Sequence, residues 1–325
     1  MNDTADTIII GGGFSGLLAA IHLKELDSGH TVTVLEQGEY PLQHNTFLIL
    51  PPLARQLLKR ITPLNNYKFN EGRFLIFKIA DLERDIIIET VDTAVVNYLD
   101  FVQMFYEIAQ NLGVNIRDNH KAIRVDTRKR LVETQCGQKI GYGSVIEAAG
   151  AAASVKNESV LFRHSTVDQD IYCYPMQCAY TLSALTGSTE QAERPALEKV
   201  DKNTVFKVVP TADNLPKTYA GIIRIGDMNG YIDHFIDIHT RYTVVSAISA
   251  AESIYGGKSA KFYYRSMENI ADDIKFSLLV RQLVTNNIAL IHTPDFSELL
   301  TSILLFGTPY KKLYEYLKSK ECGNA

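Results

Sequence analysis

Hydrophobic and polar positions at the start of the chain follow a strand–helix–strand order. Residues 7–10 form a short apolar run, which predicts a buried strand. Apolar residues then recur at helical spacing over residues 14–26, and residues 31–35 form a second, β-branched apolar run. The chain is therefore predicted to begin with a β-α-β unit.

The central part of the chain is predicted to be rich in strands. A short helix over residues 53–61 follows a proline pair, and residues 74–79 and 86–90 are predicted to be antiparallel strands. A helix over residues 98–112 ends at Gly113, which takes the C-cap position. Further extended segments are expected at residues 114–116, 122–125, 131–135, 144–148, 171–185, 205–209 and 220–225.

The last third of the chain is predicted to be mostly helical, beginning with a helix over residues 240–254. Strands and helices that alternate at the start, followed by a β-rich middle, predict an α/β fold with a second, antiparallel sheet. No clean linker divides the sequence into consecutive domains. We therefore expect the second sheet to be inserted into the first domain.

Composition and charge narrow the class of protein. Hydrophobic residues make up 46% and charged residues 22% of the chain, as in globular proteins. The net charge is −4, and the basic cluster Arg128-Lys129-Arg130 lies between two strand-like runs, where it indicates a solvated hairpin turn. We expect no nucleic-acid partner. Since no run reaches the ~18 apolar residues of a membrane-spanning helix, we also expect no integral membrane association.

The cysteines indicate a reducing compartment. Of the four cysteines, only Cys173 and Cys178 are close in sequence, and their odd separation places them on opposite faces of a continuous strand. Four cysteines in a chain of this length do not form a disulfide framework. We therefore expect independent thiols and a cytoplasmic location.

The sequence GGGFSG at residues 11–16 fits the pattern G-x-G-x-x-G of a phosphate-binding turn. It leaves an apolar strand and opens a helix, which is the context that the chemistry requires. Gly11 permits the tight turn, Gly13 lets the backbone approach a pyrophosphate, and Gly16 lets the helix pack close to the strand. The amides of the first helical turn, including those of Phe14 and Ser15, then face the phosphates.

Glu36 completes this pattern at the end of the second strand. A carboxylate at that position accepts hydrogen bonds from the ribose hydroxyls of a bound dinucleotide. The alternative is that Glu36 is an exposed charge at a strand end and that residues 11–16 form a structural turn. The combination of strand, glycines, helix and carboxylate favours a dinucleotide site.

Other segments resemble motifs of a known superfamily. The sequence VIEAAG at residues 145–150 and Gly226-Asp227 after a strand lie where one group of flavoproteins has further motifs. With the N-terminal turn, they make most of residues 6–285 resemble the superfamily of FAD-dependent aromatic hydroxylases and geranylgeranyl reductases. The resemblance implies that Gly150, Gly226 and Asp227 contact non-covalently bound FAD, with the Asp227 carboxylate at the ribityl chain or a phosphate.

Within this superfamily, the chain looks most similar to the geranylgeranyl reductases. Residues 226–254 follow that pattern without a gap, and residues 262–265 resemble its C-terminal region. Tyr172, Tyr174 and Pro175 resemble an aromatic-x-aromatic-proline element that lines a substrate cavity. The alternative for these aromatic residues is an ordinary position in the core.

The chain departs from the superfamily at three places. An Asp-Gly motif is replaced by Ala149 and Gly150, and Tyr98 stands where an arginine near the FAD phosphates is expected. The glycine-rich loop beside the flavin ring is replaced by Asp237, Ile238 and His239.

The altered loop supplies the one candidate catalytic residue. The resemblance implies that the helix beginning near Thr240 directs its N-terminus at the N1–C2 edge of the flavin. His239 would add a hydrogen bond or a positive charge there, whereas the alternative is a loop histidine with Asp237 as the N-cap. The acidic and histidine residues at 227, 233, 234, 237 and 239 match no standard spacing of metal ligands, so no metal is expected.

These observations imply an FAD-dependent oxidoreductase that acts on a small apolar substrate, isoprenoid or aromatic, with NAD(P)H as one candidate electron donor. Two alternatives stay open: an FAD-dependent monooxygenase, including one that modifies a partner protein, and a non-catalytic flavoprotein-like scaffold. The resemblance implies three regions: an FAD-binding domain of residues 1–40, 97–155 and 219–256, a substrate-binding β-sheet domain of residues 41–96 and 157–218, and a helical region of residues 257–325.

Overall fold

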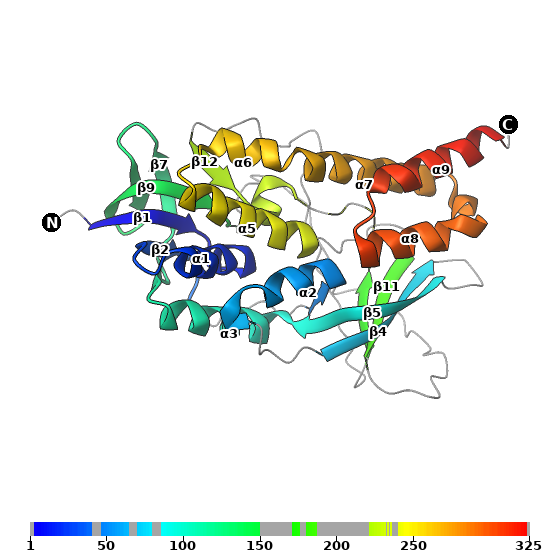
Figure 1. Ribbon diagram of the computed structural model, residues 1–325, viewed down its shortest axis with the longest axis horizontal. Coiled ribbons are helices and arrows are strands. Elements are labelled where there is room, and N and C mark those ends of the chain that lie inside the picture. Colours follow the sequence, from blue (N-terminus) through cyan, green and yellow to red (C-terminus); the bar gives the residue numbers. More distant parts are fainter. Residues whose placement is uncertain are drawn as a thin grey trace.

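A computed structural model of the protein describes residues 3–40, 47–64, 70–79, 86–149, 171–175, 180–186, 221–231, 233, 235 and 240–323. Within these residues the chain forms two sheets and a set of helices (Figure 1). The termini lie at opposite ends of the long axis of the molecule. None of the described helices is both long enough and apolar enough to cross a membrane.

The first sheet carries the N-terminal β-α-β unit. Its strand order is β6-β2-β1-β9-β8-β7, and β12 pairs with β9 outside this path. Strands β1, β2, β6, β9 and β12 pair in parallel, while β7, β8 and the start of β9 form an antiparallel extension. The bounds are β1 Asp3–Ile10, β2 Val32–Leu35, β6 Asn115–Arg117, β7 Ala122–Asp126, β8 Leu131–Thr134, β9 Lys139–Glu147 and β12 Ile222–Arg224.

Helices α1 (Phe14–Leu26) and α5 (Thr240–Tyr255) pack against each other beside this sheet, and α3 (Tyr98–Asn111) packs on α1 (Figure 1). Most residues of α1 are buried, as expected for a helix that contacts neighbours on several sides. Ala19 and Ala20 are fully buried, so their small side chains let the neighbouring elements approach closely.

The second sheet has the order β10-β11-β4-β5-β3, and its neighbouring strands are antiparallel. Its strands come from two separate stretches of sequence, on either side of α3 and the hairpin strands of the first sheet. Helix α2 (Pro52–Lys59) packs against both β5 and α5. The bounds are β3 Phe47–Leu50, β4 Asn70–Ile79, β5 Ile86–Asn97, β10 Ile171–Pro175 and β11 Tyr180–Thr186.

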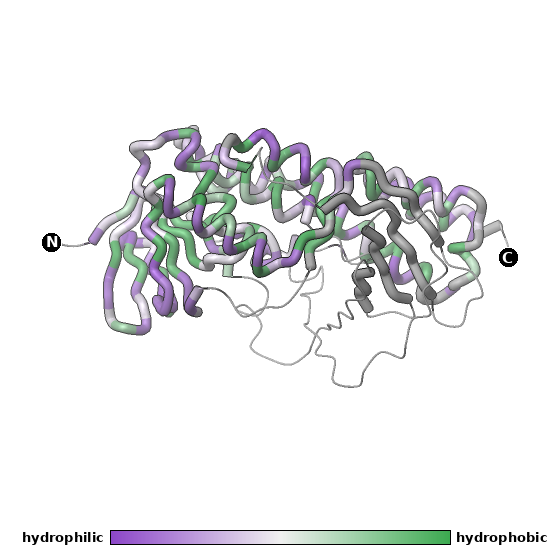
Figure 2. Tube along the Cα trace, turned by 90° about the horizontal axis from the view of Figure 1, so that it is seen from below, coloured by the Kyte–Doolittle hydropathy of each residue, from purple (hydrophilic) through white to green (hydrophobic). Residues whose placement is uncertain are grey.

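The C-terminal region is helical, and its helix α8 packs against β5 of the second sheet (Figure 1). Apolar and polar residues alternate along its helices in Figure 2, as expected where one face is packed and the other is solvated. Its core also contains Ile49 of β3 and Phe235, so this region is joined to the rest of the molecule. The bounds are α6 Ala260–Ser266, α7 Glu268–Asn286, η4 Ile288–His292, α8 Pro294–Phe306 and α9 Tyr310–Gly323.

The predicted α/β fold with a second, antiparallel sheet is confirmed. The helix predicted at residues 14–26 has those bounds, and the helix at 98–112 ends before Gly113, whose φ is +79°. The basic cluster lies in the β7–β8 hairpin, as expected. The strand expected at residues 205–209 lies outside the described residues. The exact domain bounds remain a prediction.

Strand β9 begins five residues before the predicted start at residue 144. Gly141 and Gly143 lower the strand propensity of this segment, which is why the sequence pattern did not indicate it. A Cβ at Gly143 would lie 2.8 Å from the carbonyl oxygen of Asp6. The glycine therefore allows close approach of β9 to β1.

Candidate dinucleotide-binding site

The turn between β1 and α1 depends on two glycines for its shape. Gly11 has φ +108°, and a Cβ there would lie 2.5 Å from the carbonyl oxygen of Ala148 in the neighbouring chain segment. A Cβ at Gly16 would collide with the carbonyl oxygen of Gly11. The amide of Gly11 donates to the carbonyl of Leu35 at 2.8 Å, which joins the turn to the end of β2. Gly11 and Gly16 are therefore required for the backbone to pack in this way, whether or not a ligand is bound.

Gly13 has a different environment, because it is open on the side where a ligand would bind. It is the N-cap of α1 with extended backbone angles, and no described side chain caps the helix. The nearest atom to a Cβ at Gly13 would be the hydroxyl oxygen of Tyr98, at 3.2 Å. The first turn of α1 contains no acidic residue. The amides at this helix end are therefore available to an anion.

Phe14 and Ser15 follow Gly13 in this first turn, and their side chains have separate roles. Phe14 is buried against Phe101 and Phe105, with ring centroids 5.1 and 5.2 Å away. Its side chain belongs to the core. Only the backbone amide of Phe14 is therefore placed to make the predicted contact with a cofactor. Ser15 lies next to Gly226, whose Cβ would meet the Ser15 hydroxyl at 3.2 Å.

Glu36 is buried at the end of β2, where backbone amides hold its carboxylate. One oxygen accepts from the amide of Gly12 at 2.7 Å and the other from the amide of Gly38 at 2.8 Å. A carboxylate has about four lone-pair sites, so two acceptor positions remain for ribose hydroxyls. This placement excludes the alternative of an exposed charge at a strand end.

Tyr40 was not indicated by the sequence pattern but lies beside the glycine turn. Its hydroxyl donates to the carbonyl of Gly12, and its ring packs on Tyr106 with centroids 4.2 Å apart. Burial, and then the charge of Glu36, raise the pKa of Tyr40 well above its ordinary value. The phenol is therefore neutral and acts as a hydrogen-bond donor. No local sequence signal indicates this role, because the hydrogen bond joins residues 28 positions apart.

Gly226 and Asp227 follow β12 and lie at the junction of the two helices α1 and α5. A Cβ at Gly226 would meet Ser15 of α1 at 3.2 Å and Thr243 of α5 at 3.6 Å. The amide of Gly226 donates to the hydroxyl of Ser246 at 3.0 Å. The structure thus brings the two predicted motifs together, although Gly226 comes 210 positions after Gly16 in the sequence.

The remaining predicted site residues are not tested by side-chain geometry. Tyr172, Tyr174 and Pro175 form strand β10, paired with β11, but their side chains are not among those described. The residues that lie outside the described part of the chain are Gly150, Asp237, Ile238 and His239.

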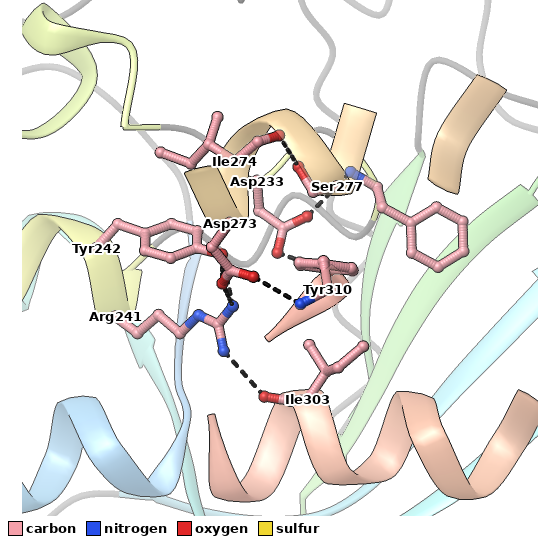
Figure 3. Close-up of polar contacts among 9 residues, drawn as sticks. Asp233, Arg241, Tyr242, Asp273, Ile274, Ser277, Ile303 and Tyr310 are labelled. Atoms are coloured by element: carbon pink, nitrogen blue, oxygen red, sulfur yellow. Dashed lines mark hydrogen bonds and ion pairs between the residues drawn. The ribbon is translucent and has the colours of Figure 1, made fainter. Parts of the chain in front are cut away.

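A buried polar network lies at the start of α5 and was missed by sequence reasoning (Figure 3). Arg241 donates to the carbonyl of Ile303 at 3.0 Å and to the carboxylate of Asp273 at 2.7 Å. The hydroxyl of Tyr242 donates to the same oxygen of Asp273 at 2.7 Å. The partners come from α5, α7 and α8, so no local sequence signal indicates the network.

Asp233 and Tyr310 extend this network toward α9. The hydroxyl of Tyr310 donates to Asp233 at 2.7 Å, and the amide of Phe235 donates to the other carboxylate oxygen at 2.9 Å. The amide of Tyr310 donates to Asp273 at 2.6 Å. Both carboxylate oxygens of Asp233 therefore accept hydrogen bonds from protein donors.

This geometry fits a dinucleotide cofactor. An uncapped helix N-terminus with glycine at the N-cap suits a pyrophosphate, and Glu36 lies at the neighbouring strand end with acceptor capacity to spare. Gly226 lies against Ser15 in the first turn of this helix.

Solved structures with the same fold include several flavoproteins. The flavin-dependent brominase Bmp2 is 13% identical and covers 99% of this chain and 100% of its own, with a TM-score of 0.62. A flavoprotein/dehydrogenase from Cytophaga hutchinsonii is 15% identical, with coverages of 98% and 100% and a TM-score of 0.64. The oxygenase of 2-methyl-3-hydroxypyridine-5-carboxylic acid is 13% identical, with coverages of 91% and 95% and a TM-score of 0.59.

No curated protein matches the sequence significantly. The sequence pattern of one family, described as pyridine nucleotide-disulphide oxidoreductase, matches residues 5–170. The matched segment is just over half of the chain and contains the glycine turn and Glu36. The chain therefore belongs to the pyridine nucleotide-disulphide oxidoreductase family, and its fold is that of the Rossmann-like flavoproteins.

Proposed function

We propose that the protein is an oxidoreductase that binds FAD non-covalently and uses the flavin as its redox centre. The observation that carries this proposal is the meeting of two motifs at one place: Gly226 lies against Ser15, in the first turn of the phosphate-binding helix. The site would then run from the N-terminus of α1 past Gly226 to α5. This path suits a dinucleotide whose pyrophosphate lies at α1 and whose flavin half lies beside α5. Family membership and the fold of flavoproteins also support FAD.

The chain contributes binding and orientation, whereas a bound flavin supplies the electron-transfer chemistry. The first-turn amides of α1 would hold the pyrophosphate, and Glu36 would hold the ribose hydroxyls of the adenosine half. The hydroxyl of Tyr98 lies 3.2 Å from the Cβ position of Gly13, so a hydroxyl group stands where the resemblance implies an arginine.

The purified protein is expected to carry FAD or to take it up on titration. The absorbance spectrum should show flavin bands, and denaturation should release FAD, because the binding is non-covalent. Titration with FMN distinguishes the proposed site from a simple flavin pocket, since FMN lacks the adenosine that Glu36 would bind. A protein with no flavin bands that also fails to bind added FAD contradicts the proposal.

Replacement of Glu36 by glutamine is expected to weaken FAD binding about tenfold. The change removes the charge and converts one acceptor oxygen into a donor, and a hydrogen bond to a charged group contributes about 1.5–3 kcal/mol. Glu39, which is exposed on the same connection, is the matched control, and Glu39→Gln should leave the dissociation constant unchanged. Equal effects of the two substitutions on the FAD dissociation constant would exclude a specific role for Glu36.

For the reaction, we propose reduction or oxidation of an apolar substrate, isoprenoid or aromatic, in a cavity lined by the second sheet. The support is the resemblance of Tyr172, Tyr174 and Pro175 to a substrate-lining element. Anaerobic mixing of the reduced protein with polyprenyl and aromatic compounds tests it, with reoxidation of the flavin as the signal. Failure of every apolar compound to reoxidise the flavin would contradict the proposed substrate class.

Oxygen insertion is a second candidate, because two structures that share the fold over most of this chain are described as a brominase and an oxygenase. Stopped-flow mixing with NADPH and NADH separates the candidates. Flavin reduction by either donor that a substrate accelerates would favour a monooxygenase. A bound flavin that cannot be reduced by light or by chemical reductant would favour the non-catalytic scaffold.

A further inference from the structure

The first turns of two helices converge on one point of the chain. Ser15 in α1 and Thr243 in α5 both lie against Gly226, at 3.2 and 3.6 Å from its Cβ position. The N-terminus of a helix carries a partial positive charge of roughly half a unit. A ligand that extends from the α1 N-terminus past Gly226 therefore enters the electric field of the α5 N-terminus as well.

Arg241 adds a full positive charge at the start of α5, where a cation is unfavourable with respect to the helix dipole. The side chain is buried, with 8% of its surface exposed. An arginine is not deprotonated in proteins, so the guanidinium keeps its positive charge. Burial alone lowers the pKa of Arg241, but Tyr242 and Asp273 outweigh it, so the pKa is raised above its ordinary value. The guanidinium is therefore a fixed charge in this part of the molecule.

Asp273 of α7 provides the compensating negative charge. It accepts from Arg241 and Tyr242 with one oxygen and from the amide of Tyr310 with the other. Its side chain is 12% exposed, so solvent screens the pair only weakly. Asp233, held by Tyr310, is a second buried carboxylate near the same guanidinium. The electrostatic potential at the start of α5 thus depends on side chains that the C-terminal helices position.

We propose that Arg241 and Asp273 are positioning residues that set the electrostatic potential at the start of α5, and with it the reduction potential of a flavin bound there. This inference rests on the proposed function. Reduction adds two electrons and one proton to the flavin ring, so the reduced form carries one more negative charge than the oxidised form. A more positive potential at α5 then favours reduction, and a more negative potential opposes it.

Two substitutions should shift the equilibrium in opposite directions. Asp273→Asn keeps the shape and removes a negative charge, so the ratio of reduced to oxidised flavin at a fixed applied potential should rise at least threefold. Arg241→Met keeps most of the volume and removes the positive charge, so the same ratio should fall at least threefold. The measurement equilibrates the FAD-loaded protein with a redox dye of known potential.

Asp272 supplies the matched control, because it is the neighbouring residue on α7, is exposed and pairs with Lys275 one turn away. Asp272→Asn should leave the ratio unchanged. Opposite shifts for Asp273 and Arg241, with no shift for Asp272, support the inference. Shifts of the same sign, or no shift while FAD stays bound, overturn it. A purely structural role of the two residues would not make the ratio rise in one variant and fall in the other.

A milder pair of substitutions decides the matter if Asp273→Asn does not fold. Tyr310→Phe removes the hydroxyl that donates to Asp233 and leaves the carboxylate less compensated, so the reduced fraction should fall at least twofold. Tyr314→Phe on the same helix removes a hydroxyl outside this network and should have no effect. Equal ratios in these two variants overturn the inference. Lack of FAD binding by the wild-type protein contradicts the proposed function instead.

Discussion

Replacement of Gly13 by leucine is expected to abolish FAD binding and to leave the protein folded. The backbone of Gly13 is extended and lies in a region that any residue adopts, with φ −73°. Among the described residues, a Cβ there meets only the hydroxyl of Tyr98, at 3.2 Å, and a tyrosine hydroxyl can move by a few tenths of an ångström. The leucine side chain would instead cover the helix end that the pyrophosphate approaches.

The expected loss is large because the amides at this helix end cannot be replaced. Two hydrogen bonds to a charged phosphate contribute about 1.5–3 kcal/mol each, so affinity should fall about a hundredfold or more. FAD titration measures the loss, and thermal unfolding of the cofactor-free protein measures the fold. Gly13→Ala serves as the graded control with a smaller loss. A leucine variant that binds FAD within about threefold of the wild type would show that the pyrophosphate lies elsewhere.

Replacement of Gly16 by alanine is expected to destabilise the fold itself. The new Cβ would collide with the carbonyl oxygen of Gly11, and the side chain of Ala148 lies on another side at 3.3 Å. Because the carbonyl of Gly11 is a backbone group, relief of the collision requires a shift of the turn or of α1. Overpacking of a buried site of this kind costs about 3 kcal/mol of unfolding free energy.

Gly137 in the β8–β9 hairpin is the control for this prediction. It has φ +82°, and no atom of the described part of the chain lies within 4 Å of its Cβ position, so alanine there meets backbone strain alone. Such strain costs about 1–2 kcal/mol. Chemical denaturation of both variants gives the comparison. If Gly16→Ala loses no more unfolding free energy than Gly137→Ala, the close approach of α1 to the turn is not a determinant of stability.

The first part of the site could be predicted from sequence because its parts are local. Gly11, Gly13 and Gly16 sit at fixed offsets from a strand and a helix. Periodicity predicted both ends of α1 and the end of β1, but β1 begins at Asp3, four residues before its predicted start. Glu36 could be predicted because it ends the next strand. Its hydrogen bonds to the amides of Gly12 and Gly38 could not, since backbone donors carry no sequence signal.

The charged network at α5 could not be predicted, because its members are distant in sequence and have unremarkable neighbours. Arg241 and Asp273 are 32 residues apart, and Asp233 and Tyr310 are 77 apart. In the sequence, each of these four residues has the local pattern of an ordinary helix or loop residue. Their pairing follows from the packing of α7, α8 and α9 against the rest of the chain, which depends on many weak apolar contacts rather than on a motif.

The way in which Glu36 is held has a consequence for the thermodynamics of ligand capture. Both carboxylate oxygens are anchored by amides of the protein, so the side chain is confined to one rotamer before any ligand arrives. The loss of rotamer entropy, about 1.5–2 kcal/mol for a glutamate, is therefore incurred during folding. Binding does not incur it again. In the proposed site, the rigid carboxylate is therefore preorganised, and binding of a ribose there requires no further ordering of this side chain.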